Sequence, residues 1–232
     1  MKFRKLLCYV LIFAIIVSLG VTAFAEDTDE AYENSVTVYA SDSNVSDKVS
    51  SLLNDPDVDN VIVLYNTQTS PCPLIDSELF EQNSNSVSPL AFGGSMYTEY
   101  IKNVRAGGKY YSTKNIGYVE GDSGLTISLN HAVSLSTTVS NSFGFTKGQI
   151  SLKTGVDVSA SYTYQIGATF YIDRTHNGKS VKTGILTATP VYAVTLFDVY
   201  RGIQGTSNEN KIGTGKIYKP YGIKYHKEYV YY

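Results

Sequence analysis

Cysteine is nearly absent from this chain, which limits the covalent bonds that can hold its fold. Among 232 residues only Cys8 and Cys72 occur, and tryptophan does not occur at all. Cys8 lies in an N-terminal segment that we expect to be removed, so the mature chain cannot form an internal disulfide. Cys72 stands between two prolines, and we expect it to remain a free thiol or to pair between molecules.

Sequence motifs of catalysis are also missing. The chain has no Gly-x-Ser-x-Gly or His-Glu-x-x-His motif, no glycine-rich phosphate loop and no cluster of cysteine and histidine. Its three histidines, His131, His176 and His226, are far apart in the sequence. A catalytic triad can assemble from distant residues, so the sequence does not exclude one. We nevertheless expect a protein that is not an enzyme and that has no cofactor or metal site.

A long apolar run occurs only at the N-terminus. Basic residues between positions 2 and 5 precede an apolar run from Leu6 to Val17, and Ala23-Phe24-Ala25 has the small-residue pattern of a cleavage site. We therefore predict a signal peptide over residues 1–25, cleaved after Ala25, and a secreted mature protein. No later window of ~18 residues is apolar enough to predict a transmembrane helix.

Charges of the two signs are unevenly distributed. Residues 26–92 contain 13 acidic residues and a single basic one, Lys48, whereas residues 93–232 contain 8 acidic and 15 basic residues. This suggests either that the acidic part covers the basic part or that the basic part faces an anionic surface. An acidic leader that only aids solubility explains the same counts. The basic residues are scattered and form no recognised module, so we expect no nucleic-acid partner.

The N-terminal part of the predicted mature chain has its own pattern. Residues 26–65 form an acidic segment in which Ser35–Ala40, Val45–Leu53 and Val61–Tyr65 have the patterns of a strand, a helix and a strand. This small α/β unit is too small to make a core alone. Residues 66–94 are rich in serine, asparagine and proline and are predicted to be a linker.

Residues 95–232 are almost entirely β-like and are predicted to form a β domain. Gly107-Gly108 is expected to break the first strand of this domain. Val181–Tyr200 is apolar on both faces, which is typical of a central strand, and Pro190 within it is expected to mark a bulge or bend.

The clearest signal in the β domain is an alternation of apolar and hydroxyl-bearing residues. Apolar residues prevail at the odd positions from Ile127 to Phe145 and at the even positions from Ile150 to Ile172. Side chains alternate between the two faces of a strand, so this period of two predicts two unusually long amphipathic strands. Lys147-Gly148 lies where the alternation changes phase and is predicted to be the two-residue turn of a hairpin.

This turn also determines a register, in which Val139 faces Val156 and Val133 faces Tyr162. Every apolar residue then meets the apolar face of the other strand, and only shifts by an even number of residues preserve the match. The apolar face of the predicted hairpin includes Val133, Leu135, Val139, Phe143, Phe145, Ile150, Leu152, Val156, Val158 and Tyr162. The polar face includes Ser136, Thr138, Ser140, Ser142, Lys153, Asp157 and Ser159.

These patterns predict a mainly β fold. We expect an elongated antiparallel β-sheet or sandwich that contains one long amphipathic hairpin over residues 127–172 and is preceded by the small α/β segment. A compact β-sandwich is the alternative, because two shorter strands in series, broken at Gly144 or Gly155, would imitate one long arm.

The predicted hairpin has the properties of a membrane-inserting element. A strand needs only ~9–11 residues to cross a membrane, and each arm has roughly twice that number. Within the arms only Lys153 and Asp157 are fully charged, both on the polar face, so the apolar face can contact lipid while the polar face lines water. The edges of a single hairpin would stay unpaired in hydrocarbon, so several copies must join into a ring. We therefore expect a membrane-active homo-oligomer with a target membrane as its partner.

The predicted protein is an exported β protein with a long Ser/Thr-rich hairpin flanked by other long strands. In this respect the chain from Met96 to Tyr232 resembles the aerolysin-like β-pore-forming proteins. The resemblance implies an elongated β fold, a soluble monomer, assembly on a target membrane, and often an acidic peptide that proteolysis removes. No family motif matches residue by residue, so only the hairpin positions carry over. The resemblance also allows a glycan or protein receptor, although no receptor-binding domain is recognisable.

A secreted, non-enzymatic β-sandwich that binds cell wall, glycan or protein is the alternative function. Secreted β-sandwiches also contain alternating Ser/Thr-rich strands, and the 20 tyrosines of this chain can stack on sugars. The absence of tryptophan makes sugar binding less expected but does not exclude it.

Overall fold

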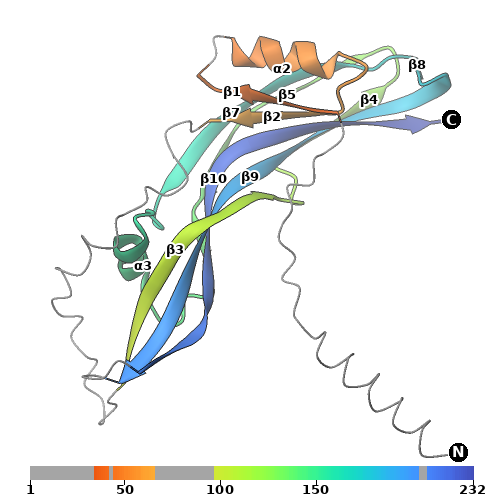
Figure 1. The fold of residues 1–232 in the computed structure, drawn as a ribbon. Coiled ribbons are helices and arrows are strands. Elements are labelled where there is room, and N and C mark those ends of the chain that lie inside the picture. The colour runs from red at the N-terminus through yellow and green to blue at the C-terminus, as the bar shows by residue number, and fades with distance from the viewer. Residues whose placement is uncertain (1–33, 42–43, 66–96, 204–207) are drawn as a thin grey trace, which may run out of the picture. The chain divides into compact units, whose positions relative to one another are not determined.

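Two long antiparallel strands, β9 (Lys179–Ile203) and β10 (Glu209–Tyr231), form the frame of the fold and are drawn in blue in Figure 1. The structure is a computed structural model, which describes residues 34–41, 44–65, 97–203 and 208–232. The other elements, in chain order, are β1 (Ser35–Tyr39), α2 (Val45–Leu53), β2 (Asn60–Leu64), β3 (Tyr97–Tyr111), β4 (Gly117–Asp122), β5 (Thr126–Ser136), β6 (Thr138–Ser140), α3 (Lys147–Thr154), β7 (Ser161–Tyr171) and β8 (Thr175–His176). The predicted mainly β fold is confirmed.

In the described part of the chain, eight strands form one main sheet and two form a second sheet. The main sheet has the order β1-β2-β10-β9-β3, with β4 and β8 also paired to β9 and β6 also paired to β10. The second sheet consists of β5 and β7 alone. Both edges of β9 are therefore paired, which agrees with the prediction of a central strand.

The partner of β9 on its outer edge changes at Pro190. Pairing with β3 ends where Tyr111 meets Val191, and pairing with β4 begins where Gly117 meets Ala188. Proline has no N–H to donate, so it fits best at a place where a ladder is interrupted. Its carbonyl still accepts a hydrogen bond from the Ser112 N–H at 3.0 Å.

The strand, helix and strand predicted for residues 35–65 are present as β1, α2 and β2. β1 runs parallel to β2, and β2 pairs antiparallel with β10. Val49 and Leu53 of α2 are buried in the core. Residues 34–41 and 44–65 of the acidic segment are therefore an integral part of the β fold and share its core.

The predicted break at Gly107-Gly108 is wrong, because β3 continues through both glycines. The register of β3 against β9 shifts between Ala106 and Lys109, and Gly108 has a φ of 80°. A bulge with glycine in the left-handed region absorbs the extra residue without ending the strand.

The two larger of three apolar clusters in the described residues lie between the main sheet and the elements packed on it. The larger one joins β5 and β7 to α2, β2 and the C-terminal half of β10, and its buried members include Leu53, Val63, Ile166, Phe170, Leu186 and Tyr225. The second cluster consists of Ile150, Val158, Phe197, Val199 and Ile217. Partly buried Val139, Phe143, Phe145 and Val156 pack against this second cluster.

The predicted signal peptide over residues 1–25, the predicted linker over residues 66–94 and Cys72 lie outside the described residues.

A nearly buried carboxylate joins the three strands β3, β9 and β10. Asp198 of β9 is only 4% exposed. Its Oδ1 lies 2.8 Å from Lys211 Nζ and accepts a hydrogen bond from Thr214 Oγ1 at 2.7 Å. Its Oδ2 lies 3.1 Å from Arg105 Nη1 and 3.3 Å from Asn103 Nδ2. Burial alone would raise the pKa of Asp198, but the hydrogen bonds from these four side chains outweigh burial and hold the pKa at about 2.

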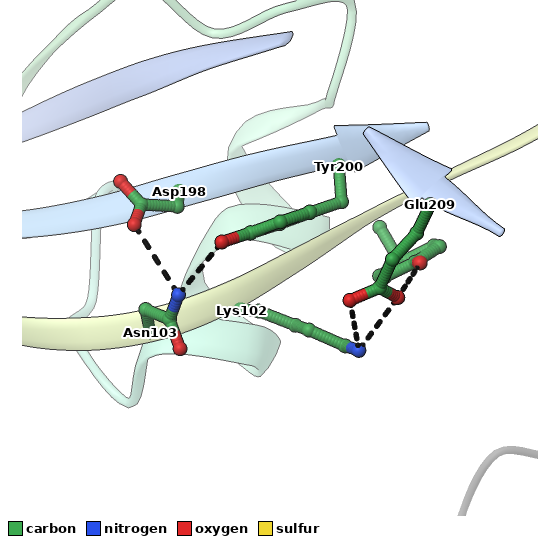
Figure 2. Close-up of polar contacts among 6 residues, drawn as sticks. Lys102, Asn103, Asp198, Tyr200 and Glu209 are labelled. Atoms are coloured by element: carbon green, nitrogen blue, oxygen red, sulfur yellow. Dashed lines mark hydrogen bonds and ion pairs between the residues drawn. The ribbon is translucent and has the colours of Figure 1, made fainter. Parts of the chain in front are cut away.

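The same end of the sheet carries a second, more exposed ion pair. Figure 2 shows Asn103 between Asp198 and Tyr200, and Lys102 beside Glu209. Asn103 Nδ2 donates to the Tyr200 hydroxyl at 3.0 Å, and Lys102 Nζ lies 2.8 Å from a Glu209 oxygen. The Lys102–Glu209 ion pair ties the beginning of β10 to β3, and the Asn103–Tyr200 hydrogen bond ties β3 to β9.

We predict that Asp198→Asn lowers the free energy of unfolding by about 1–3 kcal/mol near neutral pH, because Arg105 and Lys211 lose their shared counter-charge. The pKa of Asp198 is lower in the folded protein than the ordinary value near 4. The stabilisation that the ionised Asp198 carboxylate provides is therefore complete above pH ~4 and is lost as the pH falls through about 2. Urea unfolding at a series of pH values should show the difference between wild type and variant shrinking from pH ~4 to pH ~2. A difference that stays constant over this range would contradict the assignment.

Candidate membrane-active segment

β5 and β7 form an amphipathic two-stranded sheet. Each strand has 11 residues. The side chains that face the core are mostly buried, whereas the alternating serine, threonine, asparagine and glutamine side chains are exposed. Two of these exposed hydroxyls, Ser134 Oγ and Thr163 Oγ1, lie 3.0 Å apart. The predicted alternation of an apolar and a polar face is confirmed for these two strands.

The register of this pair differs from the predicted one by two residues. Val133 pairs with Tyr164 and Leu135 pairs with Tyr162, whereas the prediction paired Val133 with Tyr162. An even shift preserves the match of apolar faces, which explains why the sequence could not distinguish the two registers.

The β5–β7 sheet is attached to the main sheet by side-chain packing and is not strand-paired to it. The packing is close, since a Cβ placed on Gly121 of β4 would come within 2.6 Å of Ile127 Cγ2. His131 is exposed, and its Nε2 lies 2.9 Å from the Ile116 carbonyl oxygen. Neither strand contains Asp, Glu, Lys or Arg. The β5–β7 sheet itself can therefore separate from β4, β9 and β10 without breaking a ladder or exposing an ion pair; β6, which follows β5, would have to leave its short pairing with β10.

The predicted hairpin turn at Lys147-Gly148 is wrong, because these two residues begin helix α3. Thr146 Oγ1 accepts a hydrogen bond from the Gln149 N–H at 3.3 Å, and the Gln149 side chain accepts from the Thr146 N–H at 2.9 Å. This reciprocal capping box satisfies two amide groups that a helix start otherwise leaves without partners. The helix ends at Thr154, and the residue that caps it, Gly155, has a φ of 70°.

The long arms of the predicted hairpin are also interrupted before and after α3. Asn141, Phe143 and Gly144 all have positive φ, which lies outside the range of a regular strand, and no strand is present over these residues. β6 pairs with β10, where Val139 meets Ile217, and not with the residues around Val156. The period of two in residues 139–158 therefore does not correspond to a strand pair in this structure.

The structure separates the residues of the predicted apolar face into two groups. Val133, Leu135 and Tyr162 lie in the β5–β7 sheet. Val139 lies in β6, Ile150 and Leu152 in α3, and Phe143, Phe145, Val156 and Val158 in the connections on either side of α3. Apart from Leu152, which is 75% exposed, the second group packs on β9 and β10 in the smaller apolar cluster.

The residues of the predicted polar face do not share one surface. Ser136 pairs with Ser161 in the β5–β7 sheet, and Thr138 and Ser140 pair with Tyr218 and Lys216 of β10. Lys153 lies in α3, and Ser142, Asp157 and Ser159 lie in the connections. The prediction of a single continuous polar face is wrong for the residues outside β5 and β7.

Helix α2 lies along the edge of β7 that faces away from β5. The Thr169 N–H donates to Ser50 Oγ at 3.0 Å, and the Tyr171 N–H donates to Asn54 Oδ1 at 2.8 Å. Ordinarily these amide groups would pair with a neighbouring strand. Here side chains of α2 satisfy them.

Three further side chains continue this row of hydrogen bonds. Ser46 Oγ donates to the Gly167 carbonyl at 3.3 Å, the Gly167 N–H donates to the Tyr225 hydroxyl at 3.3 Å, and the Tyr65 hydroxyl donates to the Gln165 carbonyl at 3.1 Å. Burial raises the pKa of both tyrosines, so their hydroxyls stay protonated across the physiological range.

Sequence reasoning missed this edge contact. Its signal was available, because Ser46, Ser50 and Asn54 recur every four residues, on a different side of the predicted helix from Val49 and Leu53. That spacing puts the three polar residues in one row along the helix. Which strand the row would meet is a long-range contact that no local pattern specifies.

A cavity of about 520 Å³ opens between α2 and the β5–β7 sheet, and Ser46, Tyr65, Asn130 and Gln165 are among its lining residues. Among the described residues, no carboxylate, lysine, arginine, histidine or cysteine lines it. Within the described ranges no three acidic, histidine or cysteine side chains gather as a metal site would require. No helix in the described part of the chain is long and apolar enough to span a membrane.

No protein-family model matches the sequence, and no curated protein matches it.

We predict that Gly148→Ala raises the free energy of unfolding by about 0.5–1 kcal/mol, because alanine favours a helix and a Cβ at this position meets no atom within 4 Å. Gly155→Ala serves as the contrast and should lower stability by about 1–2 kcal/mol, because Gly155 has a positive φ. Both values can be measured by urea unfolding. A two-residue hairpin turn would need positive φ at Gly148, so a destabilising Gly148→Ala would argue against α3.

Proposed function

We propose that this chain is a secreted membrane-active protein of the aerolysin-like β-pore-forming type. In this proposal the segment 126–172 leaves the main sheet, assembles with the same segment of other copies, and inserts into a target membrane as β-hairpins. The observation that supports it most is the β5–β7 sheet, which is amphipathic, free of charged residues and not strand-paired to the main sheet.

The length of β5 and β7 fits this role even though the predicted longer arms are interrupted. Each strand has 11 residues, and a strand that crosses the hydrocarbon layer of a membrane needs ~9–11. The two strands are already paired with their apolar residues on one face. Insertion would therefore keep an existing ladder and exchange contact with the core for contact with lipid.

The segment between the two strands would have to refold. Helix α3 has 8 residues, and a helix of this length is marginal in water without tertiary contacts. Once Ile150 and Val158 leave the smaller apolar cluster, α3 is expected to melt. Its apolar residues would exchange burial against β9 for burial in lipid, so the refolding need not expose them to water.

Several copies are required for this function. A single hairpin would leave one edge of each strand unpaired in hydrocarbon, where each unpaired backbone group costs several kcal/mol. A closed ring of hairpins removes these edges. We therefore propose a homo-oligomer on the membrane, with a glycan or protein receptor as a further partner to be identified.

A secreted, non-enzymatic binding module for cell wall, glycan or protein is the second candidate. The rings of Tyr110, Tyr192 and Tyr218 cluster across β3, β9 and β10, with centroid separations of 5.3 Å to 6.4 Å. Tyr110 is 37% exposed. Exposed aromatic faces of this kind can stack on sugar rings.

Dye release from vesicles distinguishes the two candidates. We predict that the protein releases dye from vesicles of a total cell-lipid extract, before or after proteolysis within residues 66–92. A disulfide between Ser140→Cys and Lys216→Cys, made in a Cys72→Ser background, should abolish this release until it is reduced. These positions are paired between β6 and β10, at a separation that a disulfide can bridge.

The matched control is a disulfide between Thr183→Cys and Val230→Cys, which are paired between β9 and β10. This crosslink does not hold segment 126–172, so it should leave release unchanged. Equal leakage with the β6–β10 crosslink formed would disprove that the segment has to leave the sheet. If the parent protein binds vesicles or glycans but releases no dye at any concentration, the binding module is the better explanation.

A further inference from the structure

The outer edge of β7 lacks the usual protection of an edge strand. β3, by comparison, carries Glu99, Lys102 and Arg105 and two register shifts, and charges and bulges of this kind prevent pairing with a second chain. β7 has neither charge nor proline in its 11 residues, and its register against β5 is unbroken. Such a strand would be expected to pair with another strand if its edge were open.

Helix α2 matches this edge in spacing. Ser46, Ser50 and Asn54 recur every four residues, which corresponds to about 6.0 Å along a helix axis. The groups they meet, on Gly167, Thr169 and Tyr171, recur every two residues, which corresponds to about 6.6 Å along a strand. Because the two repeats are nearly equal, three side chains on one face of the helix can each reach the backbone of every second residue of the strand.

The capping side chains are held in the correct orientation by the helix itself. Ser50 Oγ donates to the Ser46 carbonyl at 2.8 Å, so its lone pair is available to the Thr169 N–H. Asn54 Nδ2 donates to the Ser50 carbonyl at 2.7 Å, so its Oδ1 is available to the Tyr171 N–H. The helix thereby presents acceptors to β7 as a neighbouring strand would.

We infer that α2 is an edge cap that keeps the chain monomeric, and that its displacement opens β7 to pair with the β5 edge of a second copy. The pairing of β5 with β7 within one chain shows that the two sequences are compatible over 11 residue pairs. The same antiparallel match is therefore available between two copies.

The β5 edge of the second copy is suited to this contact. Ser128, Asn130, Ala132 and Ser134 are exposed, and within the described residues no hydrogen bond to their outward backbone groups is found. One edge of the β5–β7 sheet is thus accessible and the other is capped. A contact between two different edges is heterologous, so it can extend into a ring and is not limited to a dimer.

The contact between copies is inferred from the two edges of the β5–β7 sheet. Only the role of this contact, assembly on a membrane, rests on the proposed function. The test of the contact is made in solution without lipid. Failure of self-association therefore leaves the dye-release result unaffected, and failure of dye release leaves the cap unaffected.

The test removes the capping side chains without removing the helix. In the variant Ser46→Ala/Ser50→Ala/Asn54→Ala, we expect the association constant measured by sedimentation velocity to rise roughly tenfold or more, with species larger than a dimer. Ser51→Ala is the matched control, because Ser51 is an exposed serine of the same helix that makes none of the contacts to β7 described above. It should stay as monomeric as the parent. If the triple variant fails to fold, Ser50→Ala alone should show a smaller increase.

Two proline substitutions, each added to the triple variant, identify the edges. Thr169→Pro removes an N–H that donates to Ser50 and is not part of the β5 ladder, so it should abolish association without unfolding the sheet. Ala132→Pro removes the corresponding outward N–H of β5 and should also abolish it. Dimers that persist with Ala132→Pro would show that two β7 edges pair with each other, which contradicts the proposed partner strand.

Hydrogen exchange at the amides of Thr169 and Tyr171 provides a second measurement. In the associated triple variant both amides should remain protected, because a strand of the second copy replaces α2. A folded triple variant that stays monomeric at all concentrations, whether these amides exchange quickly or slowly, would overturn the inference.

Discussion

The continuous pairing of β9 with β10 is the constraint on which the other parts of this structure depend. The ladder extends from Glu209 and Gly202 at one end to Tyr231 and Val181 at the other. It leaves one outer edge on each strand, and β3 and β4 use one of these while β2 and β6 use the other. The edges of β9 and β10 are thus occupied by other strands, and β5, β7 and α3 pack on the face of the sheet instead.

Strands within the main sheet and the β5–β7 sheet packed on it are held in two different ways. The strands of the main sheet are held by directional backbone hydrogen bonds, and at one end Asp198 adds charge-assisted bonds between β3, β9 and β10. Apart from the side-chain hydrogen bonds along the outer edge of β7, the β5–β7 sheet is attached through apolar burial, which has no directional requirement and is replaced when another apolar environment is offered. A segment that must exchange one apolar environment for another is best attached by apolar burial. This is the physical basis of the proposed membrane activity.

The acidic N-terminal segment acts on the same sheet through its polar side chains. Its apolar residues complete the larger core, while Ser46, Ser50 and Asn54 satisfy the backbone of β7. The charge asymmetry of the sequence left open whether the acidic part covers the basic part, whether the basic part faces an anionic surface, or whether the acidic part only aids solubility. The contact found at β7 is instead made by neutral side chains, because the groups to be satisfied there are backbone N–H and C=O groups, which a serine or an asparagine can match one by one.

Local pattern was sufficient for the mainly β class, for β1, α2 and β2, for the central position of β9 and for the two faces of β5 and β7, because side-chain periodicity reports directly on burial. It was not sufficient at Lys147-Gly148, where the alternation of residues 139–158 suggested strands although Thr146 and Gln149 had the spacing of a helix start. It also could not choose between registers that differ by two residues, since both bury the same faces. Only the tertiary structure decided these points, because packing of Phe143, Ile150 and Val158 on β9 and β10 stabilises a compact arrangement that an isolated hairpin lacks. The partner of the Ser46, Ser50 and Asn54 row was decided in the same way, by contacts between residues more than a hundred positions apart in the sequence.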